Sequence, residues 1–154
     1  LREEIKNKTE IGQKISVLMS SGSLVEDKIV NKLIEDIVSD KKYENGFIFD
    51  GYPRNLDQAN NLSNLLNKYN QKIDIVLKLS VSLETIKGRI SERQILEKRP
   101  DDNQDVAIKR YKTYEKSTEP VIEFYKKLNL LKVIDGERSI DQINKEISDI
   151  IGLI

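Results

Sequence analysis

Five arginines are the residues whose type and spacing could do chemistry here: Arg54, Arg89, Arg93, Arg99 and Arg110. A guanidinium group donates hydrogen bonds in a fixed fork, and it stabilises the charge spread over the oxygens of a transferring phosphoryl group without proton chemistry. The sequence contains no Cys and no His, so it offers no thiol nucleophile, no histidine base and no Cys- or His-ligated zinc site. A single arginine would more often be solvated or half of an ion pair. The five predict a phosphoryl-transfer site only if the fold brings them together.

A short apolar segment precedes the first of these arginines. Phe47, Ile48 and Phe49 are consecutive, which predicts a strand buried on both faces, and Asp50 and Gly51 end it with turn residues. In an open α/β sheet ligands bind beyond the carboxyl ends of strands, so an acid and an arginine placed here would face a ligand crevice. A plain turn followed by a solvated arginine explains the same residues about equally well.

Hydrophobic periodicity predicts the elements that would position these side chains. We expect two helical segments within 1–20, helices over 26–38 and 56–69, a helix capped by Ser82, a helix from about 101 to 125 interrupted near Pro120, and a last helix capped by Ser139. We expect strands over 47–49, 73–79 and 130–134. Gly12 is a weak point of the first helical region, because glycine disfavours helix interiors.

Composition bounds the function classes. Hydrophobic residues make up 38% of the 154 residues, which is ordinary for one globular domain. Basic and acidic residues both number 26, so an anion site must be a local cluster, and neither a nucleic-acid partner nor a membrane partner is expected. No apolar run approaches the roughly 18 residues of a membrane span, and the first residues have no signal-peptide pattern. A cytoplasmic protein is therefore expected.

The segment Asp50-Gly51-Tyr52-Pro53-Arg54, followed by Gln58, resembles the nucleoside monophosphate segment of adenylate kinases. Four later segments resemble the lid and post-lid regions of that family in order and spacing: Arg93, Arg99-Pro100-Asp101-Asp102-Asn103, Arg110 and Ser117-Thr118-Glu119-Pro120. The resemblance implies an α/β fold of the P-loop nucleoside monophosphate kinase type, with a parallel sheet flanked by helices. It also implies one domain over 1–154, with a monophosphate-binding subdomain at about 1–43, a core at about 44–93 and 100–154, and a short lid at about 94–99.

The resemblance further implies a role for each matching residue. On the AMP side, Arg2 and Arg54 match the arginines that hold the α-phosphate, and Gln58 matches the glutamine that pairs with the adenine edge. The other residues implied near AMP are Ser23, Leu24, Val25, Gly51, Tyr52, Pro53, Arg99 and Arg110. Without the resemblance, Leu24 and Val25 are equally well explained as apolar residues at a helix entry.

On the ATP side, the resemblance implies contacts from Arg89, Arg93 and Arg138. Arg89 would lie on the adenine, Arg93 would be shared between the phosphates of both nucleotides, and the backbone of Arg138 would meet the ATP base. The implied catalytic set is Arg54, Arg93, Arg99 and Arg110. Asp50 matches the acid that orders the hydration shell of magnesium, so Mg²⁺ is expected to enter with ATP and not to bind the protein directly. The protein is expected to be a monomer that binds ATP, AMP and ADP.

The sequence departs from the family pattern in one respect. None of its seven glycines belongs to a Gly-x-x-x-x-Gly-Lys-Ser/Thr loop, the usual cradle for nucleotide phosphates. In the family this loop follows a central strand, and a sheet without that strand would expose its edges. We therefore expect that roughly 30 residues of the family pattern are missing ahead of Leu1, and that a chain without them does not catalyse.

The function implied is reversible transfer of the terminal phosphoryl group from Mg-ATP to AMP, giving two ADP and balancing the adenine nucleotides. One alternative is a UMP/CMP kinase of the same superfamily, against which Gln58 argues because related pyrimidine kinases place an asparagine near this position. Another is a catalytically inactive nucleotide-binding or interaction domain that lacks the phosphate loop. A glycine-rich loop upstream would favour the kinase, and its absence the inactive domain.

Overall fold

Two short strands pair in parallel in the part of the chain that a computed structural model describes, residues 2–20, 25–43, 45–97 and 104–153. Strand β1 (Val76–Ser80) lies beside β2 (Leu131–Asp135), and Val76 pairs with Leu131 at the start of the ladder. Both strands are rich in the apolar residues that suit a pleated, half-buried surface. Because parallel strands need a long crossover, the helices between them carry the chain back to the start of β2. The expected α/β fold with a parallel sheet is confirmed.

Helices account for most of the remaining described residues. They are α1 (Arg2–Lys6), α2 (Glu10–Ser20), α3 (Asp27–Val38), the 3₁₀ turn η1 (Lys41–Tyr43), α4 (Leu56–Lys68), α5 (Leu83–Glu97), α6 (Gln104–Thr113), the π-helical turn η2 (Tyr114–Thr118), α7 (Glu119–Lys127) and α8 (Ile140–Ile151). The predicted caps are confirmed: Ser82 Oγ accepts the N–H of Thr85 at 3.2 Å, and Ser139 forms a reciprocal capping box with Gln142.

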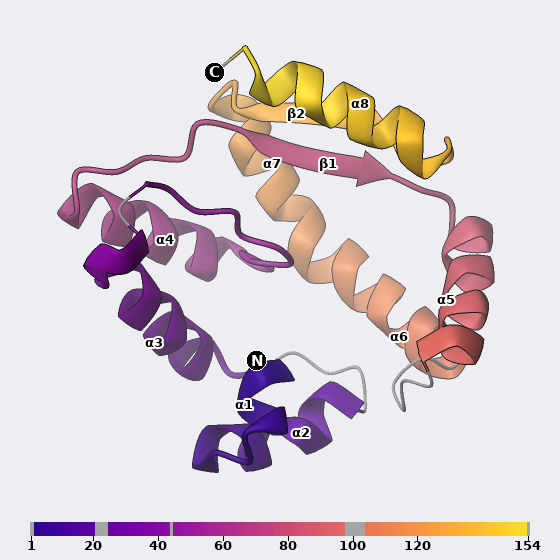
Figure 1. Cartoon of the computed structure of the whole chain (residues 1–154), viewed down its shortest axis with the longest axis horizontal. Helices are drawn as coiled ribbons and strands as arrows, with labels where there is room; N and C mark the ends of the chain where they lie inside the picture. Colours follow the sequence, from indigo (N-terminus) through magenta and orange to yellow (C-terminus); the bar gives the residue numbers. More distant parts are fainter. Residues whose placement is uncertain (1, 21–24, 44, 98–103, 154) are drawn as a thin grey trace.

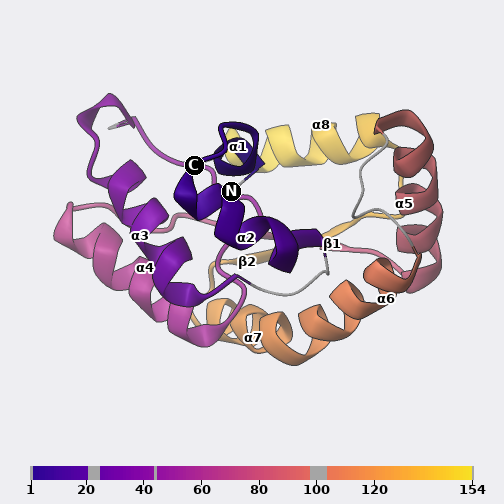
Figure 2. The same cartoon turned by 90° about the horizontal axis from the view of Figure 1, so that it is seen from below.

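The helices are distributed around the sheet and at a distance from it (Figure 1). Helices α7 and α8 both pack on β2, α3 packs against α4, and α1 packs against α2. The view from below places α1 and α2 between the α3–α4 pair and the α5–α6 pair (Figure 2). The sheet therefore supports one end of the structure, and the helices at the other end are held largely by packing on one another.

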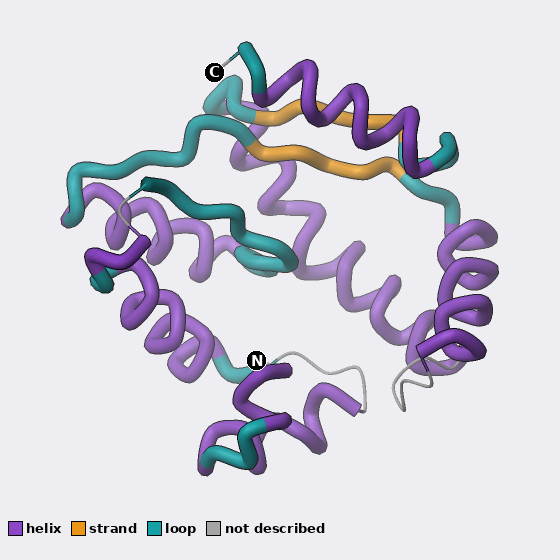
Figure 3. The backbone as a smooth tube through the Cα atoms, viewed as in Figure 1, coloured by secondary structure: helices purple, strands orange, loops and turns teal. Residues whose placement is uncertain are grey.

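The strand expected over 47–49 is wrong. These residues have no strand assignment, and among the described residues none forms a ladder with them; Figure 3 shows the segment as an extended loop beside α4. Phe47 and Phe49 stack with ring centroids 5.6 Å apart and pack against the cluster between α3 and α4, whereas Ile48 is 92% exposed. One face is therefore covered and not both. The sheet has two strands in the described ranges instead of the three expected.

The helix containing Pro120 runs differently from the expectation. The irregular turn comes earlier, in η2, and α7 then begins at Glu119 with Pro120 in its first turn. A proline is tolerated there because the first backbone N–H groups of a helix have no intrahelical partner. Pro120 therefore marks the start of α7 and does not break it. The expected helix start at 101–103 lies outside the described residues.

Gly12 is a point of close helix packing. It is buried in α2, and a Cβ at this position would collide with the carbonyl oxygen of Glu4 in α1. The Gly12 N–H also donates to Thr9 Oγ1 at 3.0 Å, which fixes the turn between the two helices. The low helix propensity of glycine is offset here by the close approach that only glycine allows.

Two apolar clusters form the core. Val38, Leu62, Leu65 and Leu66 join α3 to α4, while Ala59, Val121 and Tyr125 join α4 to α7. Helix α4 therefore contributes to both clusters and links the N-terminal helices to the sheet-packing helix α7. None of the helices within the described ranges is long and apolar enough to cross a bilayer.

We expect Leu62→Ala to lower the free energy of unfolding by about 2–5 kcal/mol, because it opens a cavity in a closely packed core. Leu62 is 1% exposed. Leu153, which is 88% exposed, provides the matched control, since Leu153→Ala removes the same atoms with little loss of burial. Urea denaturation followed by circular dichroism compares the two variants. Equal destabilisation of both would contradict the assignment of Leu62 to the core.

Candidate functional site

In the turn before α4, the side chain of Arg54 folds back toward the backbone of Gly51. Arg54 Nε donates to the carbonyl oxygen of Gly51 at 2.7 Å. Gly51 has a φ of 69°, a conformation that favours glycine, and a Cβ there would lie 3.0 Å from Nη2 of Arg54. The bond between Tyr52 and Pro53 is cis. Glycine at position 51 therefore permits both the turn and the approach of the guanidinium group.

The backbone of Arg54 is held from two sides. Its N–H donates to Gln58 Oε1 at 2.8 Å, and its carbonyl oxygen accepts from Thr118 Oγ1 at 3.0 Å. Gln58 lies in the first turn of α4, and Thr118 is the last residue of η2. Elements distant in the sequence thus fix the position from which the guanidinium group extends. Such preorganisation is what charge stabilisation in a transferring group requires.

Arg54 and Arg110 are brought near each other. Loss of solvent around the guanidinium group lowers the pKa of Arg54, the positive charge of Arg110 lowers it further, and Asp50 opposes the shift. Arg54 as a residue stays exposed, so the guanidinium group keeps contact with solvent. An arginine remains protonated under these conditions, because its usual pKa lies far above neutrality. Two neighbouring positive charges that solvent can reach favour the binding of an anion.

A carboxylate of α3 joins this turn to α4. Gln58 Nε2 donates to Asp27 Oδ1 at 2.6 Å, and Asn55 Nδ2 lies 3.0 Å and 2.9 Å from the two oxygens of Asp27. Asn55 also caps α4 by accepting the N–H of Gln58 at 2.8 Å. Sequence reasoning missed the role of Asp27, because an acid in the first turn of a helix already has a local explanation. The sequence feature that could have pointed to it is Gln58, which lies three residues after the Asn55 cap and whose amide group needs a partner when it is buried.

Gln58 is buried in this conformation. It is 2% exposed, and both ends of its amide group already have a protein partner. The expected contact with an adenine edge therefore stays a prediction, and it requires the covering side chains to move apart. The hydroxyl group of Tyr52 donates to Asn31 Oδ1 at 2.8 Å, which ties the same turn to α3 a second time.

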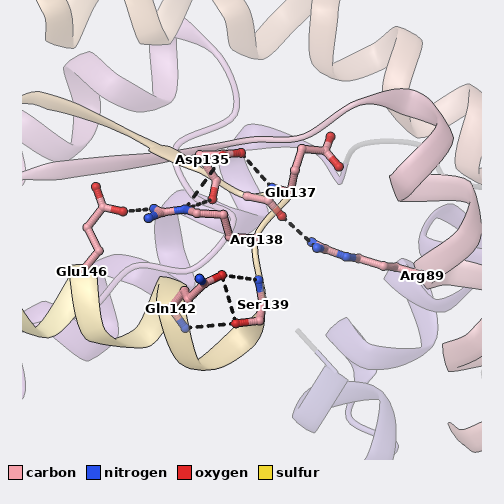
Figure 4. Close-up of polar contacts among 8 residues, drawn as sticks. Arg89, Asp135, Glu137, Arg138, Ser139, Gln142 and Glu146 are labelled. Atoms are coloured by element: carbon pink, nitrogen blue, oxygen red, sulfur yellow. Dashed lines mark hydrogen bonds and ion pairs between the residues drawn. The ribbon is translucent and has the colours of Figure 1, made fainter.

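A second cluster lies where β1 and β2 end (Figure 4). Arg89 Nη2 donates to the carbonyl oxygen of Gly136 at 2.8 Å. The two carboxylate oxygens of Glu137 accept from the Ser82 N–H and from the Thr85 hydroxyl group, each at 2.5 Å. The loop after β2 is thereby fastened to the first two turns of α5. The implied ATP-side residue Arg89 is in direct contact with this loop, and Arg93 lies one turn further along α5.

The side chain of Arg138 turns away from α5. It forms an ion pair with Glu146 of α8, and its Nε lies 3.8 Å from Asp135 Oδ2 and donates to the Asp135 carbonyl oxygen at 3.3 Å (Figure 4). These contacts fix the turn after β2 from the side of α8. Backbone groups of this loop are engaged as well, since the Gly136 N–H donates to the Ser80 carbonyl oxygen at 2.9 Å and the Glu137 N–H donates to Asp135 Oδ1 at 3.0 Å. The expected contact of the Arg138 backbone with the ATP base stays a prediction.

The other residues implied by the resemblance are placed less fully. Val25 is buried, at 7% exposure, immediately before α3. Arg2 is the first residue of α1, but its side chain lies outside the described part. Ser23, Leu24 and Arg99 lie outside the described residues altogether, and so does the end of the expected lid at 94–99.

A wide groove separates the segment 46–53 from β1. It has a volume of about 1810 Å³, and Phe49, Tyr52 and Leu77 contribute to its apolar walls. Arg110 lies on its lining, so one part of this space carries the positive charge described above. In the described ranges, no three His, Cys, Asp or Glu side chains are grouped closely enough to hold a metal ion. The role of Asp50 in ordering the hydration shell of magnesium stays a prediction.

The adenylate kinase family model matches residues 1–130. The chain belongs to the adenylate kinase family. An adenylate kinase of Pelagibacter ubique is 41% identical over 98% of this chain and 83% of its own length. An adenylate kinase of Xanthomonas campestris is 40% identical over 99% of this chain and 81% of its own length. One of Fervidobacterium nodosum is 33% identical over 98% of this chain and 82% of its own length.

Adenylate kinases are nucleoside monophosphate kinases that use Mg-ATP and bind ATP, AMP and ADP. The matched members differ in length. The alignment with the Pelagibacter protein extends over 177 residues, more than the 154 of this chain, so that adenylate kinase carries internal residues that this chain lacks. The Xanthomonas alignment extends over 152 residues. The family therefore contains longer and shorter forms, and this chain resembles the shorter.

The Glu137 contacts lead to a prediction about pH. Hydrogen bonds from Thr85, and then from Ser82, lower the pKa of Glu137. A carboxyl group with a lower pKa in the folded state stabilises the fold above its unfolded pKa, and this stabilisation is lost as the pH falls through the folded pKa. We expect Glu137→Gln to lower the melting temperature at neutral pH and to have little effect in strong acid.

Glu123→Gln is the matched control, because Glu123 is exposed and its carboxylate pairs with Lys126 one turn away on the same helix. Thermal unfolding at several pH values compares both variants with the unsubstituted chain. A Glu137→Gln effect that stayed constant from neutral pH into strong acid would show that the carboxylate charge is not what fastens the loop.

Proposed function

We propose that this adenylate kinase family member transfers the terminal phosphoryl group of Mg-ATP to AMP and gives two ADP. The observation that carries the proposal is the anchored Arg54, whose guanidinium group lies near enough to Arg110 for the charge of Arg110 to lower its pKa. In the proposed reaction an oxygen of the AMP phosphate forms a bond to the terminal phosphorus of ATP. The bond from that phosphorus to its bridging oxygen breaks, and the electron pair stays on the departing ADP.

The residues of the candidate site have distinct proposed roles. Arg54 and Arg110 neutralise the AMP phosphate, and they offset the charge that moves across the transferring group. Arg93 and Arg99 complete the catalytic set, and Arg2 joins Arg54 on the AMP phosphate. No side chain has to act as a base, because a phosphate monoester dianion is already a nucleophile. Magnesium enters with ATP and supplies charge neutralisation on its phosphates, and Asp50 orients its hydration shell.

We also propose how the chain is divided among the two nucleotides. Residues 1–43 form the AMP-side subdomain, with Ser23, Leu24 and Val25 near the ribose and base and Gln58 on the adenine edge. The turn Gly51-Tyr52-Pro53 lines the same site. Residues 44–93 and 100–154 form the core, in which Arg89 and the backbone of Arg138 receive the ATP base. Residues 94–99 form a short lid, and the protein acts as a cytoplasmic monomer in adenine nucleotide balance.

We expect Arg54→Ala to weaken AMP binding roughly ten- to hundred-fold, because a charge-assisted hydrogen bond contributes about 1.5–3 kcal/mol. Turnover should fall further, since a preorganised donor contributes on the order of 3 kcal/mol to lowering the barrier. Isothermal titration calorimetry with AMP measures the first effect, and a coupled assay on protein that includes a glycine-rich phosphate loop measures the second. Lys32→Ala is the control, because Lys32 pairs with Asp36 on the exposed surface of α3. AMP affinity unchanged in Arg54→Ala would remove Arg54 from the site.

We expect AMP to be preferred over UMP and CMP by roughly ten- to hundred-fold, because a smaller base leaves the buried Gln58 amide partly unpaired, at a cost of about 1–3 kcal/mol. Gln58→Ala should chiefly weaken the use of AMP and leave Mg-ATP binding unchanged. A coupled assay at fixed Mg-ATP with each monophosphate, on protein that includes a glycine-rich phosphate loop, measures this preference. Equal or better activity with UMP or CMP would move the chain to the pyrimidine kinases, and binding of nucleotides without turnover of any would favour an inactive nucleotide-binding domain.

A further inference from the structure

We propose that Asp27 is a positioning residue that fixes which way round the Gln58 amide faces, and that it thereby makes the site accept adenine and reject hypoxanthine. This inference rests on the proposed AMP site. It adds a specificity-determining residue on α3 that contacts Gln58 and not the reacting phosphates. The argument depends on which hydrogen-bonding positions of the amide are already occupied.

A glutamine amide has two donor positions on its nitrogen and two acceptor positions on its oxygen. In Gln58, one donor position is used by Asp27 Oδ1 at 2.6 Å, and one acceptor position is used by the backbone N–H of Arg54 at 2.8 Å. An ionised carboxylate can only accept, and a backbone N–H can only donate. If the amide were reversed, its NH₂ group would face the N–H of Arg54, and its oxygen would face the carboxylate of Asp27. Neither pair could form a hydrogen bond. The two partners therefore fix its direction.

Asp27 is itself held in place, so it cannot follow a reversed amide. Asn55 Nδ2 lies within hydrogen-bonding distance of both carboxylate oxygens, and the Asn55 side-chain oxygen is occupied by the N–H of Gln58 at the start of α4. Asn55 therefore has a fixed direction as well. The carboxylate is connected to the cap of α4 on one side and to the amide on the other, and both connections require an acceptor at position 27.

After these two hydrogen bonds, the Gln58 amide still has one N–H that can donate and one oxygen lone pair that can accept. Because the direction of the amide is fixed, the places of this donor and this acceptor are fixed too. The pairing edge of adenine offers a ring nitrogen that accepts and an amino group that donates. The same edge of hypoxanthine has a ring N–H that donates and a carbonyl oxygen that accepts. The two bases have nearly the same size and shape, so steric exclusion cannot separate them. An amide with a fixed direction matches adenine and places like groups against hypoxanthine.

Burial strengthens this discrimination. Gln58 is 2% exposed, so water has little access to the amide. When a base reaches the amide, a mismatched pair is left without water to satisfy it, and unsatisfied buried groups are costly. Tyr52 and Arg54, which precede Gln58, are tied to α3 and to η2 by hydrogen bonds. These bonds hold the turn before α4 in place, so the amide keeps its direction while the covering side chains move apart to admit a base.

The test compares AMP with IMP, its hypoxanthine counterpart, by isothermal titration calorimetry. We expect the unsubstituted chain to bind AMP about ten- to hundred-fold more tightly than IMP. In Asp27→Ala this ratio should fall by about tenfold, because the amide loses one of its two directional partners. Asp27→Asn should give an intermediate ratio, since its side chain can accept through oxygen but can also turn and donate. Asp36→Ala, which removes an exposed acid of the same helix, should leave the ratio unchanged.

A second measurement reads the amide directly in the nucleotide-free chain. The side-chain NH₂ signals of Gln58 in a ¹⁵N correlation spectrum should exchange slowly with water in the unsubstituted chain and faster in Asp27→Ala and Asp27→Asn. Thermal unfolding establishes whether each variant is folded. If Asp27→Ala does not fold, Asp27→Asn provides both the ratio and the exchange rate.

The outcomes separate this inference from the proposed function. An undiminished preference for AMP over IMP in folded Asp27→Ala or Asp27→Asn would overturn the role of Asp27 and leave the AMP site standing. Equal binding of AMP and IMP by the unsubstituted chain would overturn the fixed amide direction. Failure of the unsubstituted chain to bind AMP would overturn the proposed substrate, and the specificity role of Asp27 with it.

Discussion

Parallel pairing of β1 with β2 is the constraint on which the second cluster depends, because strands that run the same way end at the same edge of a sheet. The start of α5 and the loop after β2 therefore meet, although more than fifty residues of sequence separate them, as the Ser82–Glu137 separation of 55 illustrates. The crossover that this pairing requires includes α6, η2 and α7. On its way back to β2 the chain packs against α4 through α7. Arg110 and Thr118 reach the Arg54 turn only because the crossover takes this path. The pairing of β1 with β2 thus determines where two groups of arginines lie: Arg54 with Arg110, and Arg89 with Arg138. Side-chain hydrogen bonds then fix the individual side chains.

Features with a local cause could be predicted from the sequence. Ser82 and Ser139 cap their helices because the cap is determined by residues within three positions, and α4 follows its own apolar stripe. The 47–49 segment could not be predicted in this way, because a run of apolar residues does not reveal whether a neighbouring strand is present. Its phenylalanines instead cover the α3–α4 cluster on one side. The two helical segments expected within 1–20 are found, but the role of Gly12 in their packing could not be predicted, since propensity describes an isolated helix and not the contact of α1 with α2.

The candidate site could be predicted only in part, and mainly from the family resemblance. Family resemblance placed Arg54 and Arg110 together, which the residue spacing alone could not do, and the structure brings their charges close. It gave Gln58 a role toward the ligand but no indication of its burial or of its bond to Asp27. That bond joins α3 to α4 across the fold, so no local pattern announces it. Residues that act by holding another residue are harder to find than residues that carry a charge to a ligand, because their partners are distant in the sequence.

The π-helical turn η2 has a consequence for the relative rotation of α6 and α7. A π turn accommodates one residue more than an α turn, and each residue of an α-helix advances the side chains by about 100° around the axis. Because η2 connects two helices that continue one another in Figure 1, it sets the angle between the face bearing Arg110 and the face bearing Val121 and Tyr125. Loss of a single residue from 114–118 would leave α7 seated in the core and turn Arg110 to another side of the rod. Such a change would also move the buried Ala107 and the packing of α6 against α5, so the length of this short turn couples the position of Arg110 to the seating of α6.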